Sequence, residues 1–435
     1  MGFAGMEDRA AIEAEAAWDE RDLPVTLHQM LSGTAQKYPN NNAISYQIFS
    51  GPDDKAETFT WSELLGKVNQ AANMFRSLGV KENDVVAYIL PNCNEAVITL
   101  LGGAVAGIVN PINPLLEPEQ IASILRETNA KVVVTLKAFP KTDIAQKVAE
   151  AVRHAPHVNT VLEVDLNRYV TPPKSWIIPL IRPKIENKAE LAHADYLNFN
   201  KGLSKQPTTL NFEDVSQDRV AFYFHTGGTT GMPKVAQHKY SGVIYNGWLG
   251  GTLLYTAEDN VICPLPLFHV FACHVILMAA VASGAHVVFP TPQGYRGEGV
   301  FENFWKLIER WKRSYDLKAS VQTHAHLPNR HCIENRLFIK LSSKQNEIAV
   351  DLQTAETLRF QFQNGTLLKA DQSLSFQPVK RDLNRDQGPS TEYDIDVFVP
   401  YFRNLHLVPQ TIDSILWQHK VRPFIHLVND CSRED

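Results

Sequence analysis

The chain has 435 residues, of which 44% are hydrophobic and 20% are charged, and its formal net charge is −5. This length allows two or three domains with separate cores, and the composition is that of a globular protein rather than a disordered or fibrous one. The slightly acidic balance gives no reason to expect nucleic acid or an acidic membrane as the main partner.

The cysteines and the amino-terminal residues indicate a cytoplasmic location. Five widely spread cysteines form no Cys-x-x-Cys pair, which suits a reducing compartment and mostly buried thiols. Residues 1–24 are acidic, lack the basic-then-apolar order of a signal peptide, and are expected to form a leader. No stretch approaches the roughly 20 apolar residues of a membrane span, so no integral membrane segment is expected.

From residue 25 to residue 311 the sequence alternates between helix and strand patterns. Thr60-Trp61-Ser62-Glu63 has the spacing of a capping box, and the helix that it opens is expected to end at Gly79. Val85–Leu90 is a continuous apolar run, typical of a strand buried in a parallel sheet. Further helices are predicted over 27–35 (capped by Thr26), 95–106, from 118 onward, 240–254, 270–282 and 300–311, and further strands over 43–48, near 108, and over 131–136, 220–224 and 286–289. The predicted fold class is α/β, with parallel βαβ layers.

Residues 165–206 interrupt this alternation. Prolines at 172, 173, 179 and 183 and mixed charges predict an excursion across the surface. A structural connection is the default interpretation, and contact of the apolar stretch Trp176–Ile181 with lipid or a partner is the alternative.

The most distinctive segment is the glycine-threonine loop, residues 226–234. Three glycines and three threonines, Thr226, Gly227, Gly228, Thr229, Thr230 and Gly231, fall within six positions, and Pro233 and Lys234 close the loop. Glycine lets the backbone come close to a ligand, and its N–H groups with the threonine hydroxyls suit phosphate oxygens. Lys234 would add a positive charge. The spacing is not that of a Walker A loop, and an ordinary glycine-threonine turn is the alternative interpretation.

The pattern changes at about Lys312. Residues 313–392 predict short strands at 337–341, 348–352, 358–362 and 374–376, with Asn364-Gly365 as a hairpin turn. Residues 393–435 open a new strand–helix–strand unit, which reads as a truncated Rossmann-like βαβ unit. The predicted domains are therefore 25–312, 313–392 and 393–435.

The first part closely resembles the adenylate-forming acyl-CoA synthetases of the AMP-binding superfamily. The segment 225–234 resembles their phosphate-binding motif, with Gly227 where many members carry serine. The stretches 110–120, 266–270 and 291–297 are similar in order and spacing, so the resemblance covers about 23–311. It implies ATP, Mg²⁺ and coenzyme A as cofactors and a carboxylic acid, such as a fatty acid, as substrate. The carboxylate would form an acyl-adenylate, and coenzyme A would then displace AMP.

The resemblance also implies roles for single residues. Lys234 and residues 226–231 would bind the phosphates, which are repelled by the anionic substrate unless donors and cations surround them. His269 would lie beside the adenylate and position the carboxylate, whereas without the resemblance it reads as a histidine packed after a strand. Leu265, Leu267, Phe268 and the helix at 270–282 could line an apolar acyl site, and ordinary core packing explains them equally well.

After residue 311 the sequence departs from this family. Members of the family carry a Gly-Tyr-Gly-x-Thr-Glu segment, a ribose-binding aspartate and an adenylation lysine after this point, and no matching residues are found after residue 311 of this sequence. The sequence therefore predicts an incomplete large domain, little or no thioester formation by this chain alone, and self-association through an exposed sheet edge.

Residues 393–435 weakly resemble the start of a family 2 glycosyltransferase. The stretches 396–403, 411–418 and 428–432 match its opening strand, helix and nucleotide-facing turn. The resemblance implies that Asp430 contacts the base of a nucleotide-sugar, and an Asn-Asp turn without this role is the alternative. A glycosyltransferase-like fusion and a non-catalytic phosphate-binding remnant are thus the alternative functions.

A histidine-rich segment, residues 324–332, is a weak candidate for a zinc site. His324, His326, His331 and Cys332 lie within nine residues, but their spacing fits no common structural site. No metal site is therefore predicted from protein ligands.

Overall fold

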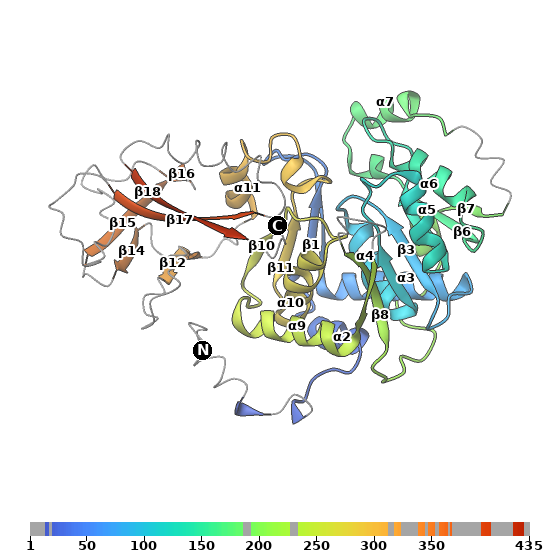
Figure 1. Cartoon of the computed structure of the whole chain (residues 1–435), viewed down its shortest axis with the longest axis horizontal. Coiled ribbons are helices and arrows are strands. Elements are labelled where there is room, and N and C mark those ends of the chain that lie inside the picture. The colour runs from blue at the N-terminus through green and yellow to red at the C-terminus, as the bar shows by residue number, and fades with distance from the viewer. Residues whose placement is uncertain are drawn as a thin grey trace.

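The computed structural model describes residues 14–16, 20–185, 193–226 and 234–311, together with the backbone of seven strands between 317 and 429 (Figure 1). The main body, up to residue 311, contains two sheets with helices packed around them. None of the helices in this described part of the chain is long and apolar enough to cross a bilayer.

The larger sheet has seven strands in the order β7-β6-β5-β3-β4-β8-β9. All neighbours pair in parallel except β8 and β9, which are antiparallel. The strands are β3 (Val85–Ile89), β4 (Ile108–Pro111), β5 (Ala130–Leu136), β6 (Thr160–Val164), β7 (Asp195–Asn198), β8 (Val220–Thr226) and β9 (Lys234–Lys239). The predicted α/β class with parallel βαβ layers is confirmed.

The smaller sheet joins segments that are far apart in the sequence. Its order is β10-β11-β1-β2, where the strands are β1 (Asn42–Gln47), β2 (Ala56–Thr60), β10 (Asn260–Ile262) and β11 (His286–Phe289). β1 is parallel to β11 and antiparallel to β2. The hydroxyl of Ser45 also lies 2.7 Å from Nε2 of His286, so side chains as well as backbone link the two segments.

Helices cover both sheets, and the starts of α2 and α3 follow the predicted capping signals. They are α2 (Leu27–Lys37), α3 (Trp61–Ser77), α4 (Asn94–Ala106), α5 (Pro118–Glu127), α6 (Ile144–Arg153), α7 (Lys174–Ile181), α8 (Phe199–Leu203), α9 (Tyr240–Leu253), α10 (Ala279–Ser283) and α11 (Phe304–Trp311). Thr26 caps α2, and Thr60 forms the predicted capping box with Glu63 at the start of α3. Gly79, just after α3, has a φ of 84°, which glycine adopts without strain.

α4 is the central helix of the fold. All of its residues are buried, and it contacts β1 of the smaller sheet as well as β3, β4 and β8 of the larger one. A helix that is apolar all round must be buried on every side, and its place between the two sheets meets that requirement.

A buried ion cluster also joins the two sheets. Glu95 of α4 is fully buried, and its carboxylate accepts hydrogen bonds from Arg168 at 2.6 Å and from the Tyr169 hydroxyl at 2.8 Å. Arg168 also pairs with Glu57 on β2. The guanidinium therefore neutralises one carboxylate from α4 and one from β2. Burial alone would lower the pKa of Arg168, but Tyr169 and the two carboxylates outweigh burial and hold this pKa above its ordinary value.

Several elements differ from the sequence-based expectation, and α6, β6 and β10 are among those that were not predicted. β2 and β9 were not predicted, because both are half-exposed strands without an apolar run. The predicted helix over 270–282 begins as a π-helix, Phe271–Met278, before α10. The excursion at 165–206 contains a 3₁₀ turn (Leu166–Tyr169), α7, β7 and α8.

Beyond residue 316 only strand backbones are described. They are β12 (Leu317–Gln322), β13 (Phe338–Ser343), β14 (Glu347–Leu352), β15 (Glu356–Gln363), β16 (Thr366–Leu367), β17 (Tyr393–Tyr401) and β18 (Val421–Asn429). β15 and β16 pair antiparallel on either side of the predicted Asn364-Gly365 turn, and β17 and β18 pair in parallel. The predicted strand at 374–376, the histidine-rich segment and Asp430 lie outside the described residues.

Candidate active site

The glycine-threonine loop connects β8 to β9. Thr226 ends β8, Lys234 begins β9, and the two residues pair directly in the antiparallel register. Lys234 is exposed at the start of β9. Gly227, Gly228, Thr229, Thr230 and Gly231 lie outside the described residues, so the structure fixes the two ends of the loop.

One residue before the loop, His225 is anchored to the neighbouring strand. Its Nε2 donates a 2.7 Å hydrogen bond to Oδ1 of Asn110 at the end of β4, and the Asn110 amide group donates to the Thr128 hydroxyl. Burial lowers the pKa of His225 to about 4, so the ring is neutral at physiological pH. Its Nδ1 atom is buried without a hydrogen-bond partner among the described residues.

The 263–269 loop, which follows β10, is fixed by residues of β3 and the turn after it. The Asn92 side chain donates to Leu265 O at 2.8 Å and accepts from Leu267 N at 2.9 Å. The buried Tyr88 hydroxyl donates to Leu267 O at 3.0 Å. These bonds set the position from which His269 emerges.

His269 itself is exposed at the start of the π-helix. Its Nδ1 atom accepts a hydrogen bond of 3.2 Å from Phe271 N, which places the ring proton on Nε2. The structure therefore does not support packing of this ring into the core. An exposed ring that presents an N–H donor suits contact with an anionic group.

The 291–297 loop, which follows β11, packs on the 263–269 loop. Tyr295 N donates to Pro264 O at 3.0 Å, and Asn92 N donates to Pro292 O at 3.0 Å. Gly294 has a φ of 59°, and a Cβ atom there would lie 1.9 Å from Pro264 O. The close approach of the two loops therefore requires glycine at this position.

The four motifs that resemble the family, at 110–120, 225–234, 266–270 and 291–297, thus meet at one edge of the fold. The segments that follow β3, β4 and β8 of one sheet lie beside those that follow β10 and β11 of the other, and Asn92 bonds to both loops of the smaller sheet. Ligands of open α/β sheets bind outside the carboxyl ends of the strands. This edge, with Lys234 and His269 on its borders, is the candidate active site.

An aromatic wall is formed by buried side chains of β8 and the π-helix, and Phe222, Phe224 and His274 are each at most 4% exposed. Phe222 and Phe224 project from one face of β8, and both rings contact His274 of the π-helix edge-on, at centroid distances of 5.6 and 5.1 Å. His274 Nε2 lies 3.2 Å from Nδ1 of His238 on β9. Burial lowers the pKa of His274 to about 3, so this wall is uncharged as well as apolar.

Sequence reasoning missed Asn92, the His238–His274 pair and the role of Asn110. Asn92 follows a buried strand directly, and an amide at that place is the signal that could have identified it as a loop anchor. His238 and His274 are 36 residues apart and meet only through the β8–β9 pairing and the π-helix. No spacing rule connects them.

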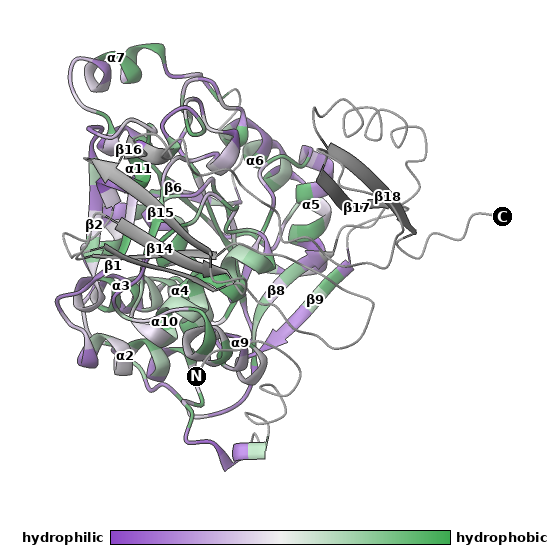
Figure 2. Cartoon of the chain, turned by 90° about the vertical axis from the view of Figure 1, so that its left-hand side faces the viewer, coloured by the Kyte–Doolittle hydropathy of each residue, from purple (hydrophilic) through white to green (hydrophobic). Residues whose placement is uncertain are grey.

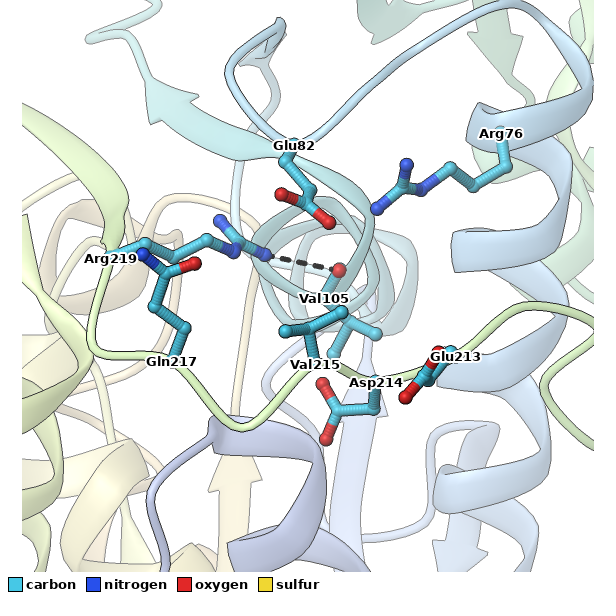
Figure 3. Close-up of a pocket in the computed structure, with 8 residues that line it drawn as sticks. All are labelled: Arg76, Glu82, Val105, Glu213, Asp214, Val215, Gln217 and Arg219. Atoms are coloured by element: carbon cyan, nitrogen blue, oxygen red, sulfur yellow. Dashed lines mark hydrogen bonds between the residues drawn. The ribbon is translucent and has the colours of Figure 1, made fainter.

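A pocket lies at the amino ends of the strands of the larger sheet, opposite the candidate active site, and its lining residues have a structural role. Figure 3 shows its lining residues, Arg76, Glu82, Val105, Glu213, Asp214, Val215, Gln217 and Arg219. Arg219 donates to Ala104 O, Val105 O and Gly107 O at 2.7–3.1 Å, which satisfies the last carbonyls of α4. Among the described residues no group of three or more histidine, cysteine or acidic side chains could hold a metal.

Comparison with known proteins places these motifs in a family. The model of the AMP-binding enzymes matches residues 31–315. The chain is 32% identical over 298 residues to marinolic acid–CoA ligase of Pseudoalteromonas sp. (strain SANK 73390). The matched region covers 67% of this chain and 42% of that protein. It is 26% identical over 278 residues to a long-chain-fatty-acid–CoA ligase of Bacillus subtilis (strain 168), which covers 61% of this chain and 47% of that protein.

A solved structure shows the same fold. The anthranilate CoA ligase AuaEII, crystallised with anthranoyl-AMP, matches with a TM-score of 0.53 and 20% identity over 69% of this chain and 50% of that chain. The chain therefore spans half or less of the length of these relatives.

Proposed function

Because this chain belongs to the AMP-binding enzymes, we propose that it acts as an acid–CoA ligase, with residues 220–297 forming the phosphate and carboxylate side of the site. The observation that carries the proposal is the meeting of the four motifs at the carboxyl ends of β3, β4, β8, β10 and β11. Asn92 bonds to the 263–269 and 291–297 loops, and the His225–Asn110 bond links the other two motifs. The curated relatives described above are CoA ligases that act on different acids, which supports a carboxylic acid as substrate.

The proposed first step is adenylate formation. An oxygen of the substrate carboxylate attacks the α-phosphorus of ATP, a new P–O bond forms, and the bond to pyrophosphate breaks with its electron pair leaving on pyrophosphate. The loop backbone and the Lys234 ammonium would stabilise the charge that grows on this leaving group. Mg²⁺, when bound, would add positive charge at the phosphates.

The proposed second step transfers the acyl group to coenzyme A. The thiolate attacks the acyl carbon, a C–S bond forms, and the C–O bond to AMP breaks.

His269 would hold the carboxylate oxygen in the first step through its Nε2–H, which is the proton position that the Phe271 contact favours. The long-chain-fatty-acid–CoA ligase among the relatives supports an acid with an apolar chain, such as a fatty acid.

Pyrophosphate release tests this proposal directly. The full chain is incubated with ATP, Mg²⁺, coenzyme A and fatty acids of different lengths, and ATP binding is measured in parallel by calorimetry. Lys234→Ala should weaken turnover on the order of a hundredfold, because one donor to the developing charge is lost. Lys239→Ala is the matched control, since it removes an exposed lysine from the other end of the same strand.

The result also decides between the sequence-based alternatives. Equal pyrophosphate release by the Lys234→Ala and Lys239→Ala variants would contradict the role of Lys234. ATP binding without pyrophosphate release by the unaltered chain would favour a phosphate-binding remnant and would agree with the predicted loss of thioester formation. The glycosyltransferase-like alternative is tested by titration with UDP-sugars.

A further inference from the structure

α7 carries an apolar face that nothing in the described fold covers. Trp176, Ile177, Leu180 and Ile181 are 70%, 48%, 83% and 59% exposed. Ile178, in contrast, is buried and belongs to the hydrophobic core. The helix is thus anchored through one side chain while its other large apolar side chains are exposed. α7 itself lies at the upper margin of Figures 1 and 2.

Polar contacts hold the helix in this orientation. Pro179 has no N–H to donate to Ser175 O one turn earlier, and the Asn167 amide group donates to that carbonyl instead, at 3.0 Å. After the helix, Arg182 binds both oxygens of Asp165 and donates to Ala138 O at 2.7 Å. The outward position of the apolar face is therefore built into the fold.

The surroundings of this face are basic. Between Asp165 and Glu186 the chain contains Arg168, Lys174, Arg182 and Lys184 and no acidic residue. Arg168 is already paired with Glu57 and Glu95, so the positive charge around the face comes from the lysines. Arg182 and Lys137 neutralise Asp165, the nearest carboxylate before the helix. Phe49, 41% exposed in the segment between β1 and β2, lies under Lys174, whose Nζ is 4.8 Å from its ring, and extends the apolar surface.

We propose that α7 and Phe49 dock the protein on the surface of an anionic lipid bilayer. Trp176 and the aliphatic side chains would enter the interface between headgroups and acyl chains, and Lys174 and Lys184 would contact the lipid phosphates. A short helix with an apolar face and basic flanks binds membranes through the sum of these two contributions. The local charge is opposite in sign to the net charge of the chain, which explains why overall composition gives no indication of this surface.

The charge distribution argues against a second copy of the chain as the occupant. In a two-fold dimer the same patch meets itself, so Lys174 and Lys184 of one molecule would approach those of the other. Like charges brought together in this way are destabilising. A bilayer of anionic lipids instead supplies the opposite charge around an apolar interior.

Vesicle co-sedimentation with the full chain tests the proposal. Vesicles of phosphatidylcholine alone are compared with vesicles of phosphatidylcholine and phosphatidylglycerol. We expect the protein to partition onto the anionic vesicles, and we expect Trp176→Ser/Leu180→Ser and Lys174→Gln/Lys184→Gln each to reduce the partition coefficient about tenfold or more. Leu254→Ser/Phe301→Ser is the matched control, because these side chains are 58% and 69% exposed elsewhere, and it should bind as the unaltered chain does.

Three results would overturn the proposal. One is that the unaltered chain stays in the supernatant with anionic vesicles, and another is that it binds both kinds of vesicle equally. The third is that the Trp176→Ser/Leu180→Ser variant binds vesicles unchanged while light scattering shows that an oligomer has dissociated, which would make this face an interface between copies. Circular dichroism checks that the substitutions, all at exposed positions, leave the fold intact.

Discussion

Oδ1 of Asn110 accepts a 2.7 Å hydrogen bond from Nε2 of His225, across the neighbouring strands β4 and β8. The bond fixes the tautomer of a neutral, largely buried imidazole one residue before the glycine-threonine loop begins. It also connects two of the motifs that were recognised separately in the sequence. The start of the loop is therefore positioned from the adjacent strand rather than by its own residues alone.

Replacing Asn110 should lower stability measurably. Asn110→Leu has a similar volume but leaves the His225 N–H group without its acceptor, so the free energy of unfolding should fall by about 1–3 kcal/mol. Urea unfolding followed by fluorescence measures this. Asn246→Leu is the control, because Asn246 is exposed and bonds only within α9, and its effect should stay within about 0.5 kcal/mol. Equal losses in the two variants would contradict the assignment.

Stability should decrease as the pH falls below the ordinary histidine range. Burial lowers the pKa of His274 to about 3 and that of His225 to about 4, from 6.5 in the unfolded chain. Between these values the unfolded chain binds protons that the folded chain does not, so each histidine removes up to about 1.4 kcal/mol of stability per pH unit. Above pH 6.5 both are neutral in either state, and their contribution to stability no longer changes with pH.

The His274→Phe variant isolates one of these contributions. Its urea midpoint should depend less on pH than that of the unaltered protein between about pH 6.5 and pH 4, because one of the two buried histidines no longer titrates on unfolding. Identical pH dependence of the two midpoints would show that His274 takes up its proton in the folded state.

Gly294→Ala should disrupt the contact between the 263–269 and 291–297 loops. A Cβ atom at this position would lie 1.9 Å from Pro264 O, and its φ of 59° is unfavourable for alanine, so we expect a loss of at least about 1–3 kcal/mol. Gly33→Ala should have the opposite effect and stabilise the protein. Its Cβ would meet nothing within 4 Å, and it lies within α2, so stability should rise by about 0.5–1 kcal/mol. Thermal melting of both variants checks the two signs together.

Removing Arg168 should be far more costly than removing a surface ion pair. Arg168→Gln leaves the fully buried Glu95 carboxylate without its cation, and breaking such a pair costs about 3–5 kcal/mol. Lys147→Gln removes a lysine that pairs with the exposed side chains of Glu117 and Asp143, which should cost at most about 1 kcal/mol. Similar urea midpoints for the two variants would contradict this role of Arg168.

The sequence predicted those parts of the fold in which local signals and burial agree. Val85–Ile89 and the Thr60–Glu63 capping box were identified because an apolar run and a cap are both local patterns. β9 was missed because Lys-Val-Ala-Gln-His-Lys, an edge strand, has one paired side and needs no apolar run. The turn into the π-helix after His269 has no known sequence signature, so an ordinary helix was expected.

For the candidate site, the motifs were recognised but not the contacts that assemble them. Thr226 and Lys234 were assigned from a dense local motif, and the pairing of these residues agrees with a loop between them. Asn92 and Asn110 act across strands and sheets, so their partners depend on topology that residue spacing does not contain. The phosphate-binding roles of residues 226–231 and the contact of Asp430 with a nucleotide-sugar stay predictions.

The pairing of β1 with β11 has a consequence for folding during synthesis. Ser45 and His286 are 241 positions apart, so the ribosome must produce most of the described domain before the first strand can meet its parallel neighbour. Contacts of such long range form slowly and leave a strand edge open meanwhile. The antiparallel pairing of β1 with β2 can form early and covers one edge of β1, whereas the edge that later meets β11 stays open until the distant strand has been made.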